Sequence, residues 1–217
     1  MKKKLFLVFL SVSALCSCDG KDPREAQIFT SLMVAAETGD HQAQRNVAWC
    51  YLQGFGVAEN HSKAVLWLKK AADGGALKGD ILAIVLLGDR YVHGDGVAAN
   101  LAEAFRLYSI AAERGDVMAA EDLGNLYKEG KGVEKNLPEA WKWYNVAARS
   151  EYAAVFPGVA ARAAKERDDL ATKMSKEEIA EAEAKALLLG IEWAKRMPRG
   201  GPYDGLEWPP KKEGRGR

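Results

Sequence analysis

The glycine pairs are the residues whose spacing most resembles a chemical motif. Gly94 and Gly96 stand one residue apart before a segment with helical periodicity, as glycines do in a phosphate-binding loop. A dinucleotide fingerprint needs a third glycine and a preceding strand, and a Walker loop needs Gly-Lys-Ser/Thr. Neither is present, because a helical pattern precedes the pair and Val97 follows it. We interpret the loop as a structural turn in which glycine supplies positive φ angles.

The other reactive side chains form no recognisable catalytic or metal-binding pattern. His41, His61 and His93 have no Cys, Asp or Glu at an established ligand spacing. The sequence contains no nucleophile elbow and no Ser-Lys motif. Cys50 lies between two aromatic residues of a helical segment, where a packed and inert thiol is expected. We therefore expect no enzyme activity and no cofactor.

The first 18 residues have the pattern of an export signal. Three lysines precede the apolar run 5–15, which is too short to span a bilayer as a helix. Leu15-Cys16-Ser17-Cys18 resembles a bacterial lipobox, which implies cleavage after Ser17 and a lipid on Cys18. Residues 1–17 are then a signal peptide and 18–23 a lipid-anchored linker. Ordinary secretion with two incidental cysteines is the alternative.

Charge and cysteine content favour a protein of the bacterial envelope. The net charge is +1, and both signs are interleaved without a basic stripe, so no nucleic acid partner is expected. After lipidation of Cys18, Cys50 has no partner for a disulfide, so an exported chain depends on its packed core. Asp19 resembles the signal that retains lipoproteins at the inner membrane. We expect the periplasmic side of the envelope, with membrane attachment through Cys18.

A repeated unit runs through the middle of the chain. The segments GFGV, GDGV and GKGV begin at residues 54, 94 and 130, each after a tyrosine and before a pair of alanines. Apolar positions after each turn follow a helical period, and an asparagine stands where a helix N-cap is needed. Glu103 and Glu139 predict capping boxes in two units. The glycines predicted to form turns are Gly54, Gly56, Gly94, Gly96, Gly130 and Gly132.

The pattern LGxxYxxGxGV, a cap residue and then paired alanines resembles the Sel1-like repeat, a helical hairpin related to the tetratricopeptide repeat. The resemblance covers residues 39–149 as three repeats. It implies an all-α fold, a right-handed solenoid of antiparallel helical hairpins. Four extra residues between Ala72 and Gly94 predict a longer first helix in the second repeat.

The segments around the repeats are expected to close the solenoid. Residues 24–38 are predicted as an N-terminal capping helix and 150–197 as a C-terminal helical cap, because an open end would expose an apolar face. Within the C-terminal cap we predict a helix over 158–174 and a second helix that starts at a capping box, Ser175 to Glu178. The composition of residues 198–217 predicts a disordered tail.

The first helices of such a solenoid line its concave side, which is the usual binding surface. Trp49 beside polar residues fits an interface anchor, and packing against the preceding capping helix is the alternative. The candidate partner-binding residues are Arg45, Trp49, Gln53, Val85, Asp89, Val92, His93, Glu121, Asn125, Lys128 and Glu129.

The resemblance implies an adaptor that binds another protein. Some small exported relatives are similar to immunity proteins that neutralise antibacterial toxins, phospholipases among them, and this role needs no catalysis. An envelope-assembly or regulatory scaffold for cell-wall or secretion machinery is the alternative. An enzyme acting on peptidoglycan would need clustered acid and base residues, which the sequence does not show. The partner and the oligomeric state stay open at this stage.

Overall fold

The computed structural model describes residues 22–73, 79–149 and 155–196, and these contain only helices, turns and loops. The predicted signal peptide, Cys18 and the predicted tail lie outside the described residues. The helices are α2 (Pro23–Glu37), α3 (His41–Gln53), α4 (His61–Ala72), α6 (Ile81–His93), α7 (Leu101–Glu113), α8 (Val117–Glu129), α9 (Leu137–Arg149), α10 (Pro157–Ala171) and α11 (Lys176–Arg196).

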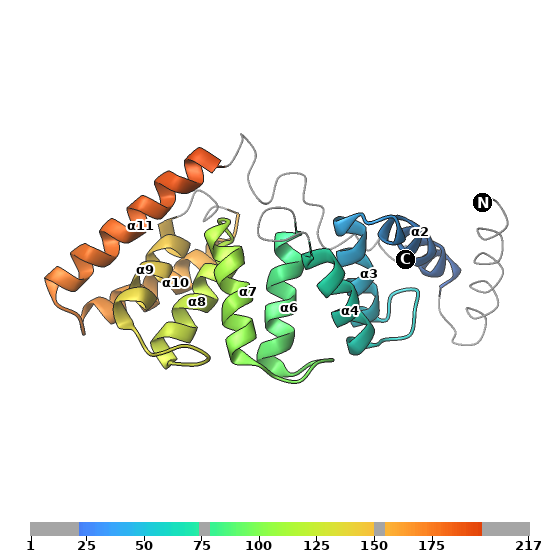
Figure 1. The fold of residues 1–217 in the computed structure, drawn as a ribbon, viewed down its shortest axis with the longest axis horizontal. Coiled ribbons are helices and arrows are strands. Elements are labelled where there is room, and N and C mark those ends of the chain that lie inside the picture. Colours follow the sequence, from blue (N-terminus) through green and yellow to red (C-terminus); the bar gives the residue numbers. More distant parts are fainter. Residues whose placement is uncertain (1–21, 74–78, 150–154, 197–217) are drawn as a thin grey trace, which may run out of the picture.

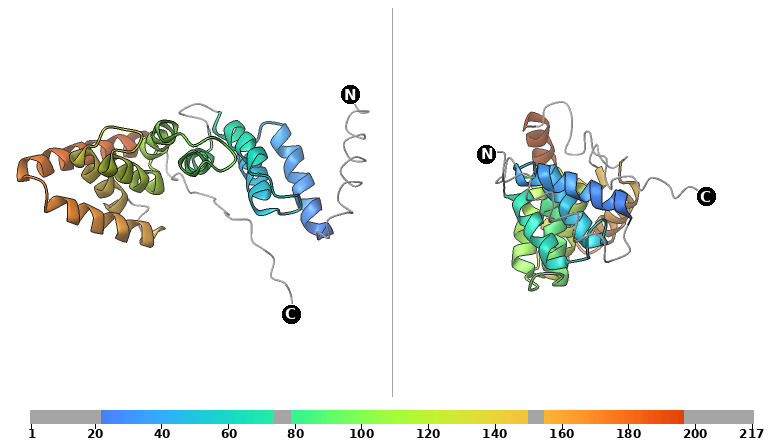
Figure 2. Two further views of the ribbon diagram at one scale, coloured as in Figure 1. Left: turned by 90° about the horizontal axis from the view of Figure 1, so that it is seen from below. Right: turned by 90° about the vertical axis from the view of Figure 1, so that its right-hand side faces the viewer.

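The helices form an all-α solenoid (Figures 1 and 2). The hairpins α3–α4, α6–α7 and α8–α9 follow one another along its long axis, with α2 at one end and α11 at the other. Each helix from α2 to α10 packs on its neighbours in chain order, whereas α11 turns back and packs on α9. Both α10 and α11 therefore cover the last repeat. None of the described helices is long and apolar enough to cross a membrane.

Short polar side chains start the helices. Asp40, Asp80 and Asp116 accept a backbone N–H in the first turns of α3, α6 and α8. Asn60, Asn100 and Asn136 do the same for α4, α7 and α9, as their spacing predicts. Ser175 and Glu178 form a reciprocal capping box at α11.

The capping boxes predicted from Glu103 and Glu139 are wrong. The backbone N–H of Asn100 already donates to the Tyr91 carbonyl at 2.8 Å, so a reciprocal side chain is not needed there. The Glu103 side chain instead binds Arg106, and Glu139 binds Lys142. Both pairs are three residues apart on one helix face.

The expected lengthening of the second repeat's first helix is also wrong. Helices α3, α6 and α8 each have 13 residues. The Asp80 backbone N–H donates to the Ala71 carbonyl at 3.0 Å, and its carboxylate caps Ala83 at 2.8 Å. These bonds fix the start of α6, so the extra residues lie in the connection between Ala72 and Asp80.

Close helix contact in the repeats depends on small residues that face larger ones. A Cβ atom at Gly88 would lie 2.6 Å from the Tyr108 ring, and one at Gly124 would lie 2.6 Å from the Tyr144 ring. These glycines let each aromatic ring lie directly on the backbone of the facing helix. The buried residues form one continuous core that extends from Phe29 in α2 to Ala186 in α11.

Candidate functional site

The glycine loops are turns that also join successive repeats. All six predicted glycines have positive φ, and the first glycine of each pair ends its helix in the left-handed conformation. The second glycine lies against the start of a helix in the preceding repeat. A Cβ at Gly96 would lie 2.4 Å from the His61 backbone, and one at Gly132 would lie 2.3 Å from the Leu101 carbonyl oxygen. The loops are therefore fixed by packing against backbone.

Three of the predicted partner-binding residues are buried, which corrects their assignment to an accessible surface. Arg45 is 2% exposed, and its guanidinium donates to Asp80 at 2.6 Å. Glu121 is held by Arg162 of α10 through two hydrogen bonds of 2.8 Å. Val85 is part of the core. These side chains join neighbouring helices and do not face a partner.

Two other predicted residues face the second helix of their own repeat. Asp89 Oδ1 accepts a hydrogen bond of 2.6 Å from the Tyr108 hydroxyl. Asn125 Oδ1 accepts one of 2.7 Å from the Tyr144 hydroxyl. Both acceptors are half-buried, so they stabilise the hairpin while one side stays open to solvent.

Trp49 occupies the place in the first repeat that Asp89 and Asn125 occupy in the other two. The second helix of that repeat carries Leu68 in place of the tyrosine, so it offers no hydroxyl. Trp49 is half-buried, and its ring lies 5.4 Å from that of Phe55 in the following turn. The residue contacts its own turn and keeps part of its surface exposed.

Lys128 and Val92 are half-buried on the same side of the solenoid. Lys128 Nζ pairs with Glu166 of α10 at 2.8 Å, and Val92 packs against the core. An ion pair therefore links the first helix α8 to α10, and Arg45 with Asp80 links α3 to the start of α6.

The fully accessible members of the predicted set form a row. Gln53, His93 and Glu129 are exposed and end α3, α6 and α8, each directly before the first glycine of its turn. His93 Nδ1 lies 2.9 Å from the Asp89 carbonyl oxygen, and Glu129 pairs with Lys131 at 2.6 Å. We define the first-helix face as the solvent-facing side of α3, α6 and α8, which carries this row.

Asp122 is a residue of this face that the sequence prediction missed. Its pKa is raised to about 7, chiefly by burial and then by the neighbouring carboxylates of Asp89, Glu121 and Asp116, against the opposing effect of Arg162. Burial also raises the pKa of Asp89, and the Tyr108 hydrogen bond opposes that shift. The sequence indicates this residue only through a comparison of repeats, since Asp122 stands where the preceding repeat has Leu86.

Burial raises the pKa of the Cys50 thiol to about 12, which leaves it protonated and unreactive. Among the described residues, no group of three or more His, Cys, Asp or Glu side chains could hold a metal ion.

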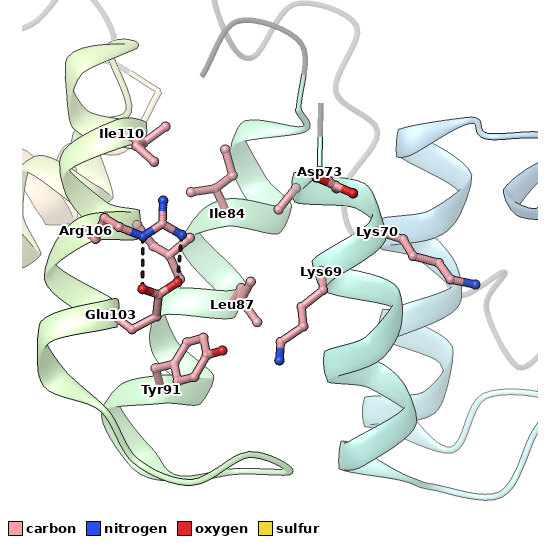
Figure 3. Close-up of a pocket in the computed structure, with 11 residues that line it drawn as sticks. Lys69, Lys70, Asp73, Ile84, Leu87, Tyr91, Glu103, Arg106 and Ile110 are labelled. Atoms are coloured by element: carbon pink, nitrogen blue, oxygen red, sulfur yellow. Dashed lines mark hydrogen bonds and ion pairs between the residues drawn. The ribbon is translucent and has the colours of Figure 1, made fainter. Parts of the chain in front are cut away.

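A cavity of about 440 Å³ lies between α4, α6 and α7 (Figure 3). Glu103 and Arg106 bind each other there through hydrogen bonds of 2.9 and 2.7 Å, so their charges offset one another. Lys69 Nζ lies 5.7 Å from the centre of the Tyr91 ring. Ile84 and Leu87 make part of the wall apolar. The cavity has no nucleophile beside a base, so it is not an active site of a recognisable kind.

Fold and surface together define a helical-repeat protein that presents an interaction surface. The Sel1 repeat model matches residues 41–75, 81–116 and 117–152. The crystal structure of a Sel1 repeat protein from Oxalobacter formigenes is 33% identical, with a TM-score of 0.55, and the match covers 64% of this chain and 96% of that one. The chain belongs to the Sel1 repeat family, whose members mediate protein–protein interactions.

More distant solved structures also match the chain. A protective antigen of uropathogenic Escherichia coli with an SLR fold is 23% identical, with a TM-score of 0.46, over 82% of this chain and 42% of that one. The immunity protein Pa5087 from Pseudomonas aeruginosa is 20% identical, with a TM-score of 0.31, over 88% of this chain and 87% of that one. These two likenesses carry no argument about function. No curated protein matches the sequence.

Proposed function

We propose that this chain binds a partner protein through its first-helix face. The observation that carries the proposal is the row of Gln53, His93 and Glu129, which repeats one exposed position along three successive hairpins. Helical-repeat proteins present such rows to extended partners, because each repeat contributes one contact of the same geometry. Trp49 adds a half-buried aromatic surface at the α3 end of the row.

The charge of the face favours a partner segment that carries Lys or Arg. Lys128 and Arg162 already pair with Glu166 and Glu121. Asp89 and Asp122 form no ion pair with a Lys or Arg of the described residues, and each pKa is raised. A cation from a partner would stabilise both carboxylates in their charged form.

The same proposal includes an envelope location, which rests on the N-terminal sequence. If a lipid is attached to Cys18, only four residues separate the anchor from α2, a reach of roughly 15–20 Å when extended. The solenoid would work close to the membrane surface. Neutralisation of a membrane-attacking toxin, such as a phospholipase, fits this location. An envelope-assembly or regulatory scaffold is the alternative.

Affinity capture followed by mass spectrometry tests the binding surface. The chain is compared with a variant that carries Gln53→Lys, His93→Lys and Glu129→Lys on the first-helix face. A control variant carries Ser62→Lys, Leu66→Lys and Ala102→Lys at exposed positions of the second helices. The proposal expects one protein that is captured by the wild type and the control and lost with the face variant. Equal capture by all three would overturn the choice of surface.

The identity of the captured protein separates the two roles. A secreted toxin supports neutralisation, and a cell-wall or secretion component supports the scaffold. The location has its own test, since Cys18→Ala should abolish labelling by a fatty-acid analogue. Persistent labelling would show that Cys18 is not the lipidated residue.

A further inference from the structure

Helix α11 has two apolar faces, and α9 covers only one of them. Ala182 and Ala186 of the first face are buried, and Ile179, Leu189 and Trp193 pack against the core beside them. Trp193 Nε1 also donates to the Glu113 carbonyl of α7 at 2.8 Å. This face is the inner side of α11, and it fixes which side of the helix points away from the solenoid.

The second face points to solvent. Leu187 is 66% exposed, Leu188 is 62% exposed and Ile191 is 43% exposed. Ala180 and Ala184 continue the stripe toward the start of the helix, and both are exposed. Steps of four, three, one and three residues place these five side chains on one side of a helix. We define them as the outer stripe of α11.

The two ends of the outer stripe differ in charge. Glu177 and Glu181 lie at its first end beside Lys176, and Lys195 lies at its last end beside Glu192. Residues 177, 184 and 191 are seven apart, so Glu177 lies in line with Ala184 and Ile191, and Lys195 lies one turn beyond Ile191. The stripe therefore resembles the seam of a coiled coil whose first end is acidic and whose last end carries a lysine.

We propose that the outer stripe binds the same stripe of a second copy of this chain, with the two α11 helices antiparallel. When Leu187 lies opposite Leu188 of the second copy, Ala184 lies opposite Ile191 of that copy. Small residues then face large ones, which allows close packing. A parallel arrangement would place Glu177 and Glu181 against their own copies, and Lys195 against Lys195.

The antiparallel register also brings opposite charges together. Lys195 of the second copy lies opposite residue 180, which is within one turn of both Glu177 and Glu181. The two copies are equivalent, so this contact forms twice in a pair. Glu181 already pairs with Lys185 of its own helix at 2.9 Å, so the contact with the second copy extends an existing ion pair.

Helix α11 packs on the second helix α9, whereas the first-helix face belongs to α3, α6 and α8. Helix α11 lies at the opposite end of the solenoid from α2 (Figure 1). A pair joined at this end would present two first-helix faces in one assembly. The inference does not depend on the proposed partner, because it concerns contact between copies of this chain.

The test uses two full-length copies with different C-terminal tags, co-expressed and solubilised, with one tag used for capture. The wild-type copies should capture each other. Leu188→Glu in both copies should lower the captured fraction about tenfold or more, because it buries carboxylates in the seam. Leu66→Glu is the matched control, since Leu66 is an exposed leucine of α4 at 60% exposure. It should leave capture unchanged.

A charge exchange tests the antiparallel register. One copy carries Glu177→Lys and Glu181→Lys, and the other carries Lys195→Glu. Each variant should fail to capture itself. The mixed pair should recover wild-type capture, because one of its two contacts keeps the wild-type charges and the other has its charges exchanged. No capture between wild-type copies, an equal loss with Leu66→Glu, or no recovery in the mixed pair would each overturn the proposal. If another protein or the chain's own C-terminal residues cover the stripe, the wild-type copies will not capture each other.

Discussion

The Tyr108 hydroxyl donates a hydrogen bond of 2.6 Å to Asp89 and so joins the two helices of the second repeat. Gly88, next to Asp89, provides the space for the Tyr108 ring. Repeat three has the equivalent set of Gly124, Tyr144 and Asn125. Repeat one instead combines Ala48, Leu68 and Trp49 at these positions. The three positions vary together because a large aromatic ring needs a glycine opposite it and an acceptor for its hydroxyl.

Tyr108→Phe removes the hydroxyl and leaves the half-buried Asp89 carboxylate without its donor. The free energy of unfolding should fall by about 1–2 kcal/mol, as measured by urea denaturation. Tyr91→Phe is the matched control, because the Tyr91 hydroxyl makes no hydrogen bond among the described residues and its ring is half-buried. Equal losses in the two variants would contradict the role given to the Tyr108–Asp89 bond.

Gly124→Ala places a methyl group within 2.6 Å of the Tyr144 ring and should lower the free energy of unfolding by about 1–3 kcal/mol. The double variant Gly124→Ala, Tyr144→Leu reproduces the Ala48 and Leu68 combination of repeat one. The free energy of unfolding of the double variant should fall by about 1 kcal/mol less than the sum of the decreases in the two single variants. Strictly additive losses would show that the two positions do not depend on each other.

Asp122 should make stability depend on pH. Its pKa of about 7 in the folded chain lies above the ordinary value of 3.8. Between about pH 4 and pH 7 the folded chain keeps a proton that the unfolded chain has lost, so this residue lowers the free energy of unfolding as pH rises. The free energy of unfolding of Asp122→Asn should therefore exceed that of the wild type by about 1–3 kcal/mol near pH 8 and equal it near pH 4. Urea denaturation across this range measures the difference, and a constant offset at every pH would rule out the titration of Asp122 as its cause.

Gly132→Ala tests the contact between a turn and the preceding repeat. Gly132 has a φ of 72°, and an added Cβ would lie 2.3 Å from the Leu101 carbonyl oxygen. Gly39 has a φ of 95° with no atom within 4 Å of such a Cβ, so Gly39→Ala measures backbone strain alone. The free energy of unfolding should fall by about 1–2 kcal/mol in Gly39→Ala. In Gly132→Ala it should fall by a further ~1–3 kcal/mol. Similar losses would mean that the loop can move away from Leu101.

Local sequence patterns specify the hairpins of this protein. Positive φ at Gly54, Gly94 and Gly130 and side-chain caps at Asn60 and Asn100 are local effects, because they involve atoms a few residues apart. A local pattern was therefore enough to place the helices, the turns and the repeat. The local pattern did not predict where α6 begins after Ala72. The Asp80 cap and the hydrogen bond from the Asp80 N–H to the Ala71 carbonyl fix that position.

Which residues of the first helices are accessible depends on tertiary contacts. Arg45 is buried because Asp80, 35 residues away, neutralises it, and Glu121 is buried because Arg162, 41 residues away, does so. Helical periodicity shows which direction a side chain takes, but the width of the buried stripe depends on neighbouring helices that are distant in sequence. For the same reason, the exposure of the second apolar side of α11 followed only from the packing of its first side on α9.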